Sequence, residues 1–224
     1  MLAVASSWPQ PERQGAAQAR VNNPDFVLFF RTHTMPTALF ILGHAGVGKS
    51  FLTTHFVQSQ RALGRSWCVL DKDVVSECWS GPLLQALGFD PDDRDSPAFK
   101  EHVRDLGYLS TLRIGRDQLE AGLDVIFPGP WNRELASGAL FSAAALGLPG
   151  ETRLRHVWLD LPEAVRRERI VQRGDPRDRW KLDNWEAYIA PLRQPRAVLE
   201  GSVESLDASL PLARQLEMLR ALAG

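Results

Sequence analysis

The chain has 224 residues, of which 44% are apolar and 24% charged, and its formal net charge is −1. This length suits one α/β domain with a sizeable core, and the near-neutral charge gives no global electrostatic reason to expect nucleic-acid binding. The two cysteines, Cys68 and Cys78, exclude a disulfide framework or a C-x-x-C zinc site, and no apolar run reaches the ~20 residues that span a bilayer. We therefore expect a cytoplasmic protein without membrane contact.

The first 34 residues differ from the rest of the chain. Residues 1–20 are rich in Ala, Gln, Pro and Ser without hydrophobic periodicity, which indicates disorder, and residues 25–30 could form a short strand or an apolar anchor. Alternatively, Met35 is the natural start, because it leads directly into the first apolar run. We predict a mostly disordered extension over residues 1–34 and one domain over residues 35–224.

From Thr37 onward, short apolar runs alternate with longer helical patterns, which predicts a parallel sheet with helices on both faces. The predicted strands are 37–42, 66–70, 123–127, 154–159 and 197–200. The predicted helices are 49–63, 74–79, 99–121, 134–146, 162–173, 185–192 and 210–222. Gly122, Gly147 and Gly174 are placed as helix stops. Residues 80–97 are expected to form a surface insertion, either a substrate cap or a solvated loop.

A complete G-x-x-x-x-G-K-S phosphate loop follows the first predicted strand and opens the first predicted helix. That context predicts nucleotide binding, because glycines let successive N–H groups point at a phosphate and the helix adds its positive end. We expect Lys49 to reach the β- and γ-phosphates of ATP and Ser50 to ligate Mg²⁺. The predicted nucleotide-binding residues of this segment are Gly43, His44, Ala45, Gly46, Val47, Gly48, Lys49, Ser50 and Phe51.

Two carboxylates, Asp71 and Asp73, follow the second predicted strand. Residues two apart in an extended chain point to the same side, so both are expected near the γ-phosphate. We assign Asp73 as the base that accepts the proton of an attacking hydroxyl, and Asp71 as the partner on the metal side. Alternatively, one of them caps the following helix.

A basic segment begins on the helix predicted at 162–173 and continues into a charged loop. Arg166, Arg169 and Arg173 are spaced i, i+3, i+7 and so share one helix stripe, which is either a solvated face or the start of a lid over ATP. We predict a lid at about residues 173–184, with Arg169 as a catalytic residue and Arg173 as a nucleotide contact, because guanidinium groups match phosphate oxygens.

The third predicted strand ends without the acidic residue that a hydrolytic switch ATPase would place there for Mg²⁺. Asp124 stands at its beginning, and Phe127-Pro128-Gly129-Pro130 stands at its end. This favours a kinase that uses Asp71 or Asp73 for the metal. Trp131 could line an acceptor pocket together with Asn132, or it could fill the core.

Together, the phosphate loop, Leu70-Asp71-Lys72-Asp73 and the arginine-rich lid resemble the small-molecule kinase branch of P-loop proteins. That branch includes adenylylsulfate kinase, gluconate kinase, shikimate kinase, chloramphenicol phosphotransferase and the zeta toxins. The resemblance covers about residues 35–188 and implies a three-layer P-loop fold, with a five-stranded parallel sheet of order 2-3-1-4-5, and ATP–Mg²⁺ as donor.

A more detailed similarity is to a bacterial group of AAA-family ATP-binding proteins of unassigned substrate. It rests on Leu70–Asp73, Asp95–Pro97, Gly122–Trp131 and Arg173–Leu182, together with Trp185 and Tyr188. The chain departs from the pattern at Phe127-Pro128, where similar proteins more often have an acidic or small residue.

The sequence thus predicts a P-loop phosphotransferase that moves the γ-phosphoryl group of ATP to a hydroxyl of an unidentified small molecule. Its predicted cofactors are ATP and Mg²⁺, nucleic acid is not expected as a partner, and the protein is expected to be a monomer or homodimer. A zeta-toxin-like nucleotide-sugar kinase, a polynucleotide kinase and an ATP-binding regulatory protein without an acceptor remain alternatives.

Overall fold

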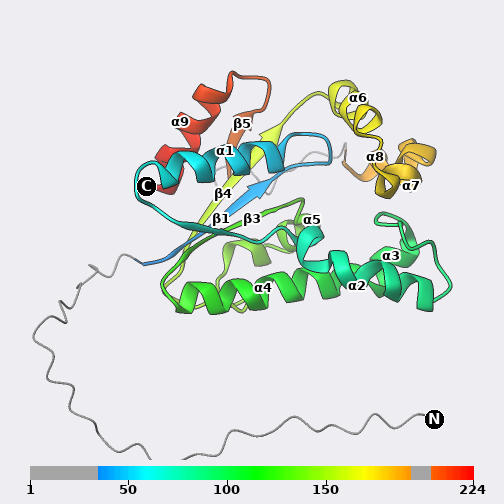
Figure 1. Cartoon of the computed structure of the whole chain (residues 1–224), viewed down its shortest axis with the longest axis horizontal. Helices are drawn as coiled ribbons and strands as arrows, with labels where there is room; N and C mark the ends of the chain where they lie inside the picture. The colour runs from blue at the N-terminus through cyan, green and yellow to red at the C-terminus, as the bar shows by residue number, and fades with distance from the viewer. Residues whose placement is uncertain (1–34, 193–202) are drawn as a thin grey trace, which may run out of the picture. The chain divides into compact units, whose positions relative to one another are not determined.

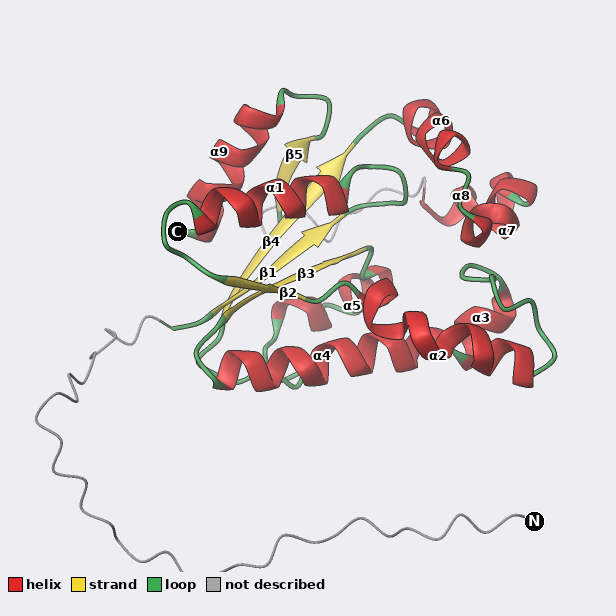
Figure 2. Ribbon diagram, in the orientation of Figure 1, coloured by secondary structure: helices red, strands yellow, loops and turns green. Residues whose placement is uncertain are grey.

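The computed structural model describes residues 35–192 and 203–224. Five parallel strands form its sheet in the order β2-β3-β1-β4-β5 (Figure 2). They are β1 (Thr37–Leu42), β2 (Trp67–Val69), β3 (Asp124–Gly129), β4 (Arg153–Asp160) and β5 (Glu204–Asp207). The predicted fold class and strand order are confirmed.

Helices cover both faces of the sheet, with α1 and α9 on one face and α2 and α4 on the other (Figure 1). The α-helices are α1 (Lys49–Arg61), α2 (Lys72–Ala86), α3 (Pro97–His102), α4 (Arg104–Glu120), α5 (Asn132–Ala136), α6 (Glu163–Arg173), α7 (Arg179–Asp183), α8 (Trp185–Ile189) and α9 (Leu212–Ala223). Short 3₁₀ helices are η1 (Ala139–Phe141), η2 (Pro176–Asp178) and η3 (Ala190–Leu192). No helix of the described residues is both long and apolar enough to cross a membrane.

Strand β1 lies at the centre of the sheet and is buried along its whole length. Because successive side chains of a strand point to opposite faces, Phe40 and Leu42 pack with β3, α4 and α5, whereas Leu39 and Ile41 pack with α1 and α9. The phosphate loop follows β1 directly, so the most deeply anchored strand of the fold positions it.

A third and smaller hydrophobic cluster lies away from the sheet. Its buried members are Leu84 of α2, Phe99 of α3 and Val103 between α3 and α4, with Trp79 and Leu83 packed against them. This cluster fixes α2 and α3 to each other. The first part of the segment predicted as an insertion at residues 80–97 is helical, because α2 continues through Pro82 as far as Ala86.

The structure corrects two predicted helices and does not describe one predicted strand. The strand predicted at 197–200 lies outside the described residues, and the fifth strand of the sheet is Glu204–Asp207. The helix predicted at 99–121 is broken at Val103, which leaves the helical region with φ −123°. The helix predicted at 134–146 ends at Ala136, because Gly138 adopts a left-handed conformation with φ 76°.

Candidate active site

The phosphate loop joins the end of β1 to the start of α1 in the way that the motif predicts. Gly46 has φ 79°, and a Cβ at this position would lie 2.5 Å from the main-chain oxygen of Arg166, so only glycine lets the loop approach α6 this closely. Val47 is 1% exposed and packs in the core, so its side chain anchors the loop and cannot reach a ligand. The loop is thereby held between the sheet and α6.

Lys49 bridges the two sides of this loop. Its Nζ donates to the main-chain oxygens of Gly43 at 2.8 Å and His44 at 3.0 Å. Burial lowers the pKa of Lys49 to about 8, although the nearby carboxylates of Asp73 and Asp71 favour its charged form. The polyphosphate of a nucleotide would supply the anionic partner that this ammonium lacks in the loop.

Asp71 and Asp73 lie at the N-terminus of α2, and both line the same cavity as Lys49. Asp71 is the N-cap, because its Oδ1 accepts a hydrogen bond of 2.9 Å from the main-chain N–H of Asp73. The extended geometry from which their proximity was predicted is therefore wrong for Asp73, which belongs to the first helical turn. The two carboxylates reach the cavity together because both stand at the N-terminus of α2, one as the N-cap and one in the first turn.

The two carboxylates have opposite pKa shifts. Burial and the negative charge of Asp73 raise the pKa of Asp71. Burial also acts to raise the pKa of Asp73, but the contact with Lys72 and the charges of Lys49 and Arg177 outweigh it, and the net shift is downward. Asp73 is therefore ionised at neutral pH, and its side chain is 54% exposed to accept a proton.

Of the three arginines in the stripe predicted on α6, two reach the phosphate loop. Arg166 is 6% exposed and donates to the main-chain oxygens of Leu161 at 3.1 Å and Ala45 at 3.5 Å. Arg169 donates to the main-chain oxygen of Val47 at 3.4 Å and lines the cavity. Two members of the predicted stripe thus face the loop, and Arg169 does so from the wall of the cavity.

Arg173 also lines the cavity, but it is held within the segment predicted as the lid, residues 173–184. Its Nε donates to Oδ2 of Asp178 at 2.8 Å, and Asp178 is only 1% exposed. Lys181 donates to the other oxygen of Asp178 at 2.7 Å and pairs with Asp95 at 2.9 Å. Another lid residue, Arg177, pairs with Glu77 of α2 at 2.7 Å. Ion pairs therefore connect the lid to α2 and to the loop that precedes α3.

The end of β3 carries aromatic packing in place of an acid. Phe127 is fully buried and stacks on Phe40 with ring centroids 4.9 Å apart. Trp131 is also fully buried, and its edge meets Tyr108 with ring centroids 4.7 Å apart, so it fills the core. Asn132 lines the cavity, whereas Trp131 does not.

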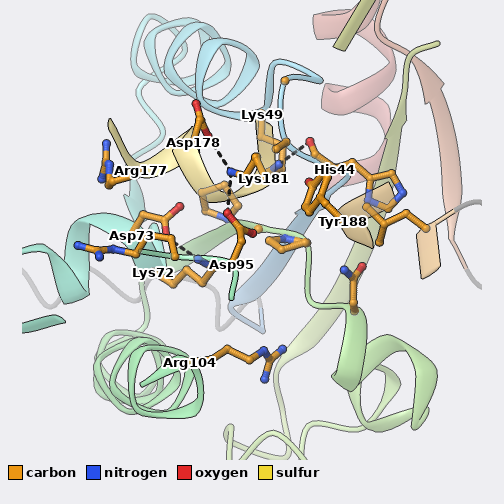
Figure 3. A pocket seen from close by; sticks show the side chains of 18 of the residues that line it. His44, Lys49, Lys72, Asp73, Asp95, Arg104, Arg177, Asp178, Lys181 and Tyr188 are labelled. Atoms are coloured by element: carbon orange, nitrogen blue, oxygen red, sulfur yellow. Dashed lines mark hydrogen bonds and ion pairs between the residues drawn. The ribbon is translucent and has the colours of Figure 1, made fainter. Parts of the chain in front are cut away.

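One cavity of about 920 Å³ brings these groups together. Figure 3 shows Lys49 and Lys181 on one side of it, Asp73 and Lys72 at its flank, and Arg104 on the opposite side. The predicted site residues that line it are His44, Ala45, Gly46, Gly48, Lys49, Ser50, Phe51, Asp71, Asp73, Arg169 and Arg173. Gly43 and Val47 do not line it: Gly43 contributes its backbone to the loop, with φ 142°, and the Val47 side chain anchors the loop in the core.

The donor set suits Mg²⁺ only if the nucleotide completes it. Among the described residues, no group of three or more His, Cys, Asp or Glu side chains could hold a metal ion. Ser50 carries a hydroxyl and Asp71 a carboxylate, and both residues line the cavity. Mg²⁺ in nucleotide sites is held by one or two protein oxygens together with phosphates and water. The residues present therefore fit a magnesium–nucleotide complex.

Several cavity residues were not predicted as site residues from the sequence. Lys72 contacts Asp73, Arg104 stacks on Tyr108 with Cζ 3.9 Å from the ring centroid, and Lys181 is buried between two carboxylates. Lys72 lies within the Leu70–Asp73 motif, between the two predicted site carboxylates, so the sequence itself could have indicated it as a site residue. Arg104 and Tyr108 carry no motif, because they are brought to the site only by the path of α4.

Comparison with solved structures gives the same fold. The APS kinase of Mycobacterium tuberculosis, solved with AMPPNP and APS, is 19% identical, with 84% of this chain and 97% of that chain covered and a TM-score of 0.53. A sugar kinase from Janibacter sp. HTCC2649 is 16% identical, with 84% and 94% covered and a TM-score of 0.55. Identities this low show similarity of fold alone.

No curated protein matches the chain. A family model described as an AAA domain (AAA_33) matches residues 39–195, which is more than half of the chain. The phosphate loop, α2 with its two carboxylates and the lid all fall within the matched range. The chain therefore belongs to the AAA_33 family of P-loop AAA domains.

Proposed function

We propose that the protein is a kinase that transfers the γ-phosphoryl group of ATP to a hydroxyl of a small molecule. The observation that carries this proposal is the shared cavity in which Lys49 of the phosphate loop faces Asp73 at the start of α2. A site that only binds a nucleotide needs the lysine. A site that transfers phosphoryl also needs an ionised carboxylate beside the γ-phosphate to take the proton of the acceptor.

In the proposed reaction, the acceptor oxygen attacks the γ-phosphorus while the bond between that phosphorus and the β–γ bridging oxygen breaks. Asp73 takes the hydroxyl proton, and ADP leaves with the electrons of the broken bond. Lys49 and Arg169 stabilise the charge on the transferring group. Mg²⁺, when bound by Ser50 and Asp71, would neutralise charge on the β- and γ-phosphate oxygens.

The absence of an acidic residue at the end of β3 supports transfer over hydrolysis. Phe127 packs in the core at this point, and Pro128 and Gly129 follow it along the cavity wall. None of these side chains could orient an attacking water. The fold shared with the APS kinase and the sugar kinase, and the nucleotide analogue and APS bound in the former, support the same reaction class.

Incubation with γ-labelled ATP and fractionated cell extract tests the proposal. We expect label on a metabolite with wild-type protein and none with Lys49→Ala, because the alanine variant lacks the cation that holds the β- and γ-phosphates. Tight ATP binding without label on any compound would instead favour a regulatory ATP-binding protein.

A further inference from the structure

Cationic side chains outnumber carboxylates in the part of the cavity that lies away from the phosphate loop, where the acidic residues are Asp71, Asp73 and Asp95. This acceptor half is formed by α2, the loop before α3, α3, the start of α4 and the turn after β3. Figure 3 shows Arg104 there, opposite Lys49. The cations of the acceptor half are Lys72, Arg94, Lys100, Arg104 and Arg133.

Three of these five cations have carboxylate partners. Lys72 contacts Asp73, while Arg104 and Arg133 share a network with two acidic residues. In that network Glu134 accepts from Arg104 at 2.9 Å and 3.1 Å, and Asp105 accepts from Arg133 at 2.8 Å. Two positive and two negative charges therefore balance around the start of α4.

Arg94 and Lys100 have no carboxylate partner within the described residues. Arg94 donates to the main-chain oxygens of Pro91 at 2.8 Å and Asp93 at 2.7 Å. Lys100 lies over the ring of Trp180, with Nζ 5.6 Å from its centroid. The acceptor half thus holds two positive charges without an ion-pair partner, one on the loop before α3 and one on α3 itself.

Arg104 adds a fixed donor to these two charges. Its guanidinium is stacked on Tyr108 and held by Glu134, and its side chain is 11% exposed. The hydrogen bonds of Arg104 come from its two Nη atoms, and within the described residues its Nε–H donates to no acceptor. A guanidinium held in one plane with an unused donor suits the oxygens of a carboxylate or phosphate.

We propose that the acceptor is an alcohol that also carries an anionic oxygen group, a carboxylate or a phosphate ester, which binds against Arg94, Lys100 and Arg104. This inference rests on the kinase function proposed above. A neutral acceptor would displace water from these cations without replacing its interactions, whereas an anion would replace them. The same cations would offset the repulsion between an anionic acceptor and the ATP polyphosphate.

The acceptor class can be tested before the acceptor is identified. Cell extract freed of nucleic acids by ultrafiltration is separated on an anion exchanger, and each fraction is incubated with the protein and γ-labelled ATP. We expect label only on compounds from the retained fraction. Label on a compound from the unretained fraction, or only on the nucleic acids that the filter removed, would overturn the inference.

Treatment of the retained fraction with phosphatase, removed before the assay, distinguishes the two anionic groups. Loss of the labelled product would identify a phosphate ester, whereas its persistence would identify a carboxylate. Either result agrees with the proposed acceptor class. Absence of label from every fraction contradicts the kinase function itself, and the following binding measurement then decides the anion site separately.

Inorganic phosphate serves as a probe that needs no turnover. It is titrated into protein saturated with AMPPNP and Mg²⁺, so that the phosphate loop is already filled. We expect binding that weakens at least about tenfold in the double variant Arg94→Gln/Lys100→Gln, because charge-assisted hydrogen bonds are lost. Arg113→Gln, which removes an exposed charge from α4 outside the cavity, is the matched control. No phosphate binding, or equal binding by the double variant, would overturn the site.

Discussion

Lys181 of the lid and Asp95 of the loop before α3 form an ion pair of 2.9 Å between Nζ and Oδ2. Lys181 also donates to the buried Asp178, which in turn holds Arg173. Arg173 is on α6, the helix that contacts the phosphate loop, and Asp95 is on the loop that also carries Arg94. A continuous chain of charged groups therefore connects the two halves of the site.

Replacement of Lys181 by methionine is expected to remove the ion pairs that link Asp178 to Asp95. Asp178 and Asp95 would remain in the site without their shared cation, and breaking a buried pair in this way costs about 3–5 kcal/mol. We expect faster hydrogen exchange over residues 173–192 and a higher KM for ATP. The control is Arg179→Gln, since Arg179 is exposed and lies 3.6 Å from Asp90, an arrangement worth about 0–1 kcal/mol. Equal exchange rates in the two variants would contradict the importance of the buried pair.

ATP affinity should fall as the pH rises above the pKa of Lys49, about 8 in the ligand-free protein. Only the protonated lysine attracts the polyphosphate, so nucleotide binding raises this pKa and takes up a proton above pH 8. If only the charged form binds, the apparent Kd should be about tenfold higher at pH 9 than at pH 7. Calorimetry in buffers of different ionisation enthalpy measures both quantities.

The conservative variant Lys49→Arg separates titration from geometry. A guanidinium stays protonated across this range, so ATP binding by this variant should lose its dependence on pH, whatever its absolute affinity. A wild-type affinity that is constant from pH 7 to pH 9 would show that Lys49 titrates outside this window.

Asp73→Asn is expected to slow phosphoryl transfer by a factor of about 10²–10⁴ while leaving ATP affinity largely unchanged, because the amide cannot accept the proton. Single-turnover transfer and nucleotide binding are measured on the same variant. Asp71→Asn is the paired comparison, and its defect should depend on the Mg²⁺ concentration. Wild-type turnover by the Asp73→Asn protein would exclude Asp73 as the base.

Gly115 of α4 makes room for Phe127 of β3. A Cβ at residue 115 would lie 2.3 Å from Cζ of that ring, so overpacking by Gly115→Ala should cost about 1–3 kcal/mol even though alanine favours a helix. Urea denaturation measures the loss. Phe127→Leu in the same chain should relieve part of it, and additive effects of the two substitutions would show that the close contact is not the cause.

The elements that could be predicted most fully are those with strong local signals. The run of apolar residues before Gly43 and the G-x-x-x-x-G-K-S pattern define β1, the loop and the start of α1, and the structure has all three. In β5 only Leu206 is buried, and the strand pairs on one side alone, so hydrophobicity gives little sign of it.

Long-range packing determines the features that the sequence pattern did not reveal. The break at Val103 has neither glycine nor proline, and it is stabilised by burial of Phe99 and Val103 against Leu84 of α2. Arg173 was predicted as a nucleotide contact, and its pairing with Asp178 depends on the turn of the lid. The role of Arg173 toward ATP remains a prediction.

The separate hydrophobic cluster of Leu84, Phe99 and Val103 has an evolutionary consequence. The segment that carries Arg94 and Lys100 is supported by this cluster and not by the two cores that hold the sheet. Mutations in this segment can therefore change the proposed anion site without disturbing the strands that present the phosphate loop. If the acceptor binds there as proposed, a lineage can keep its phosphate loop intact while its choice of acceptor diverges.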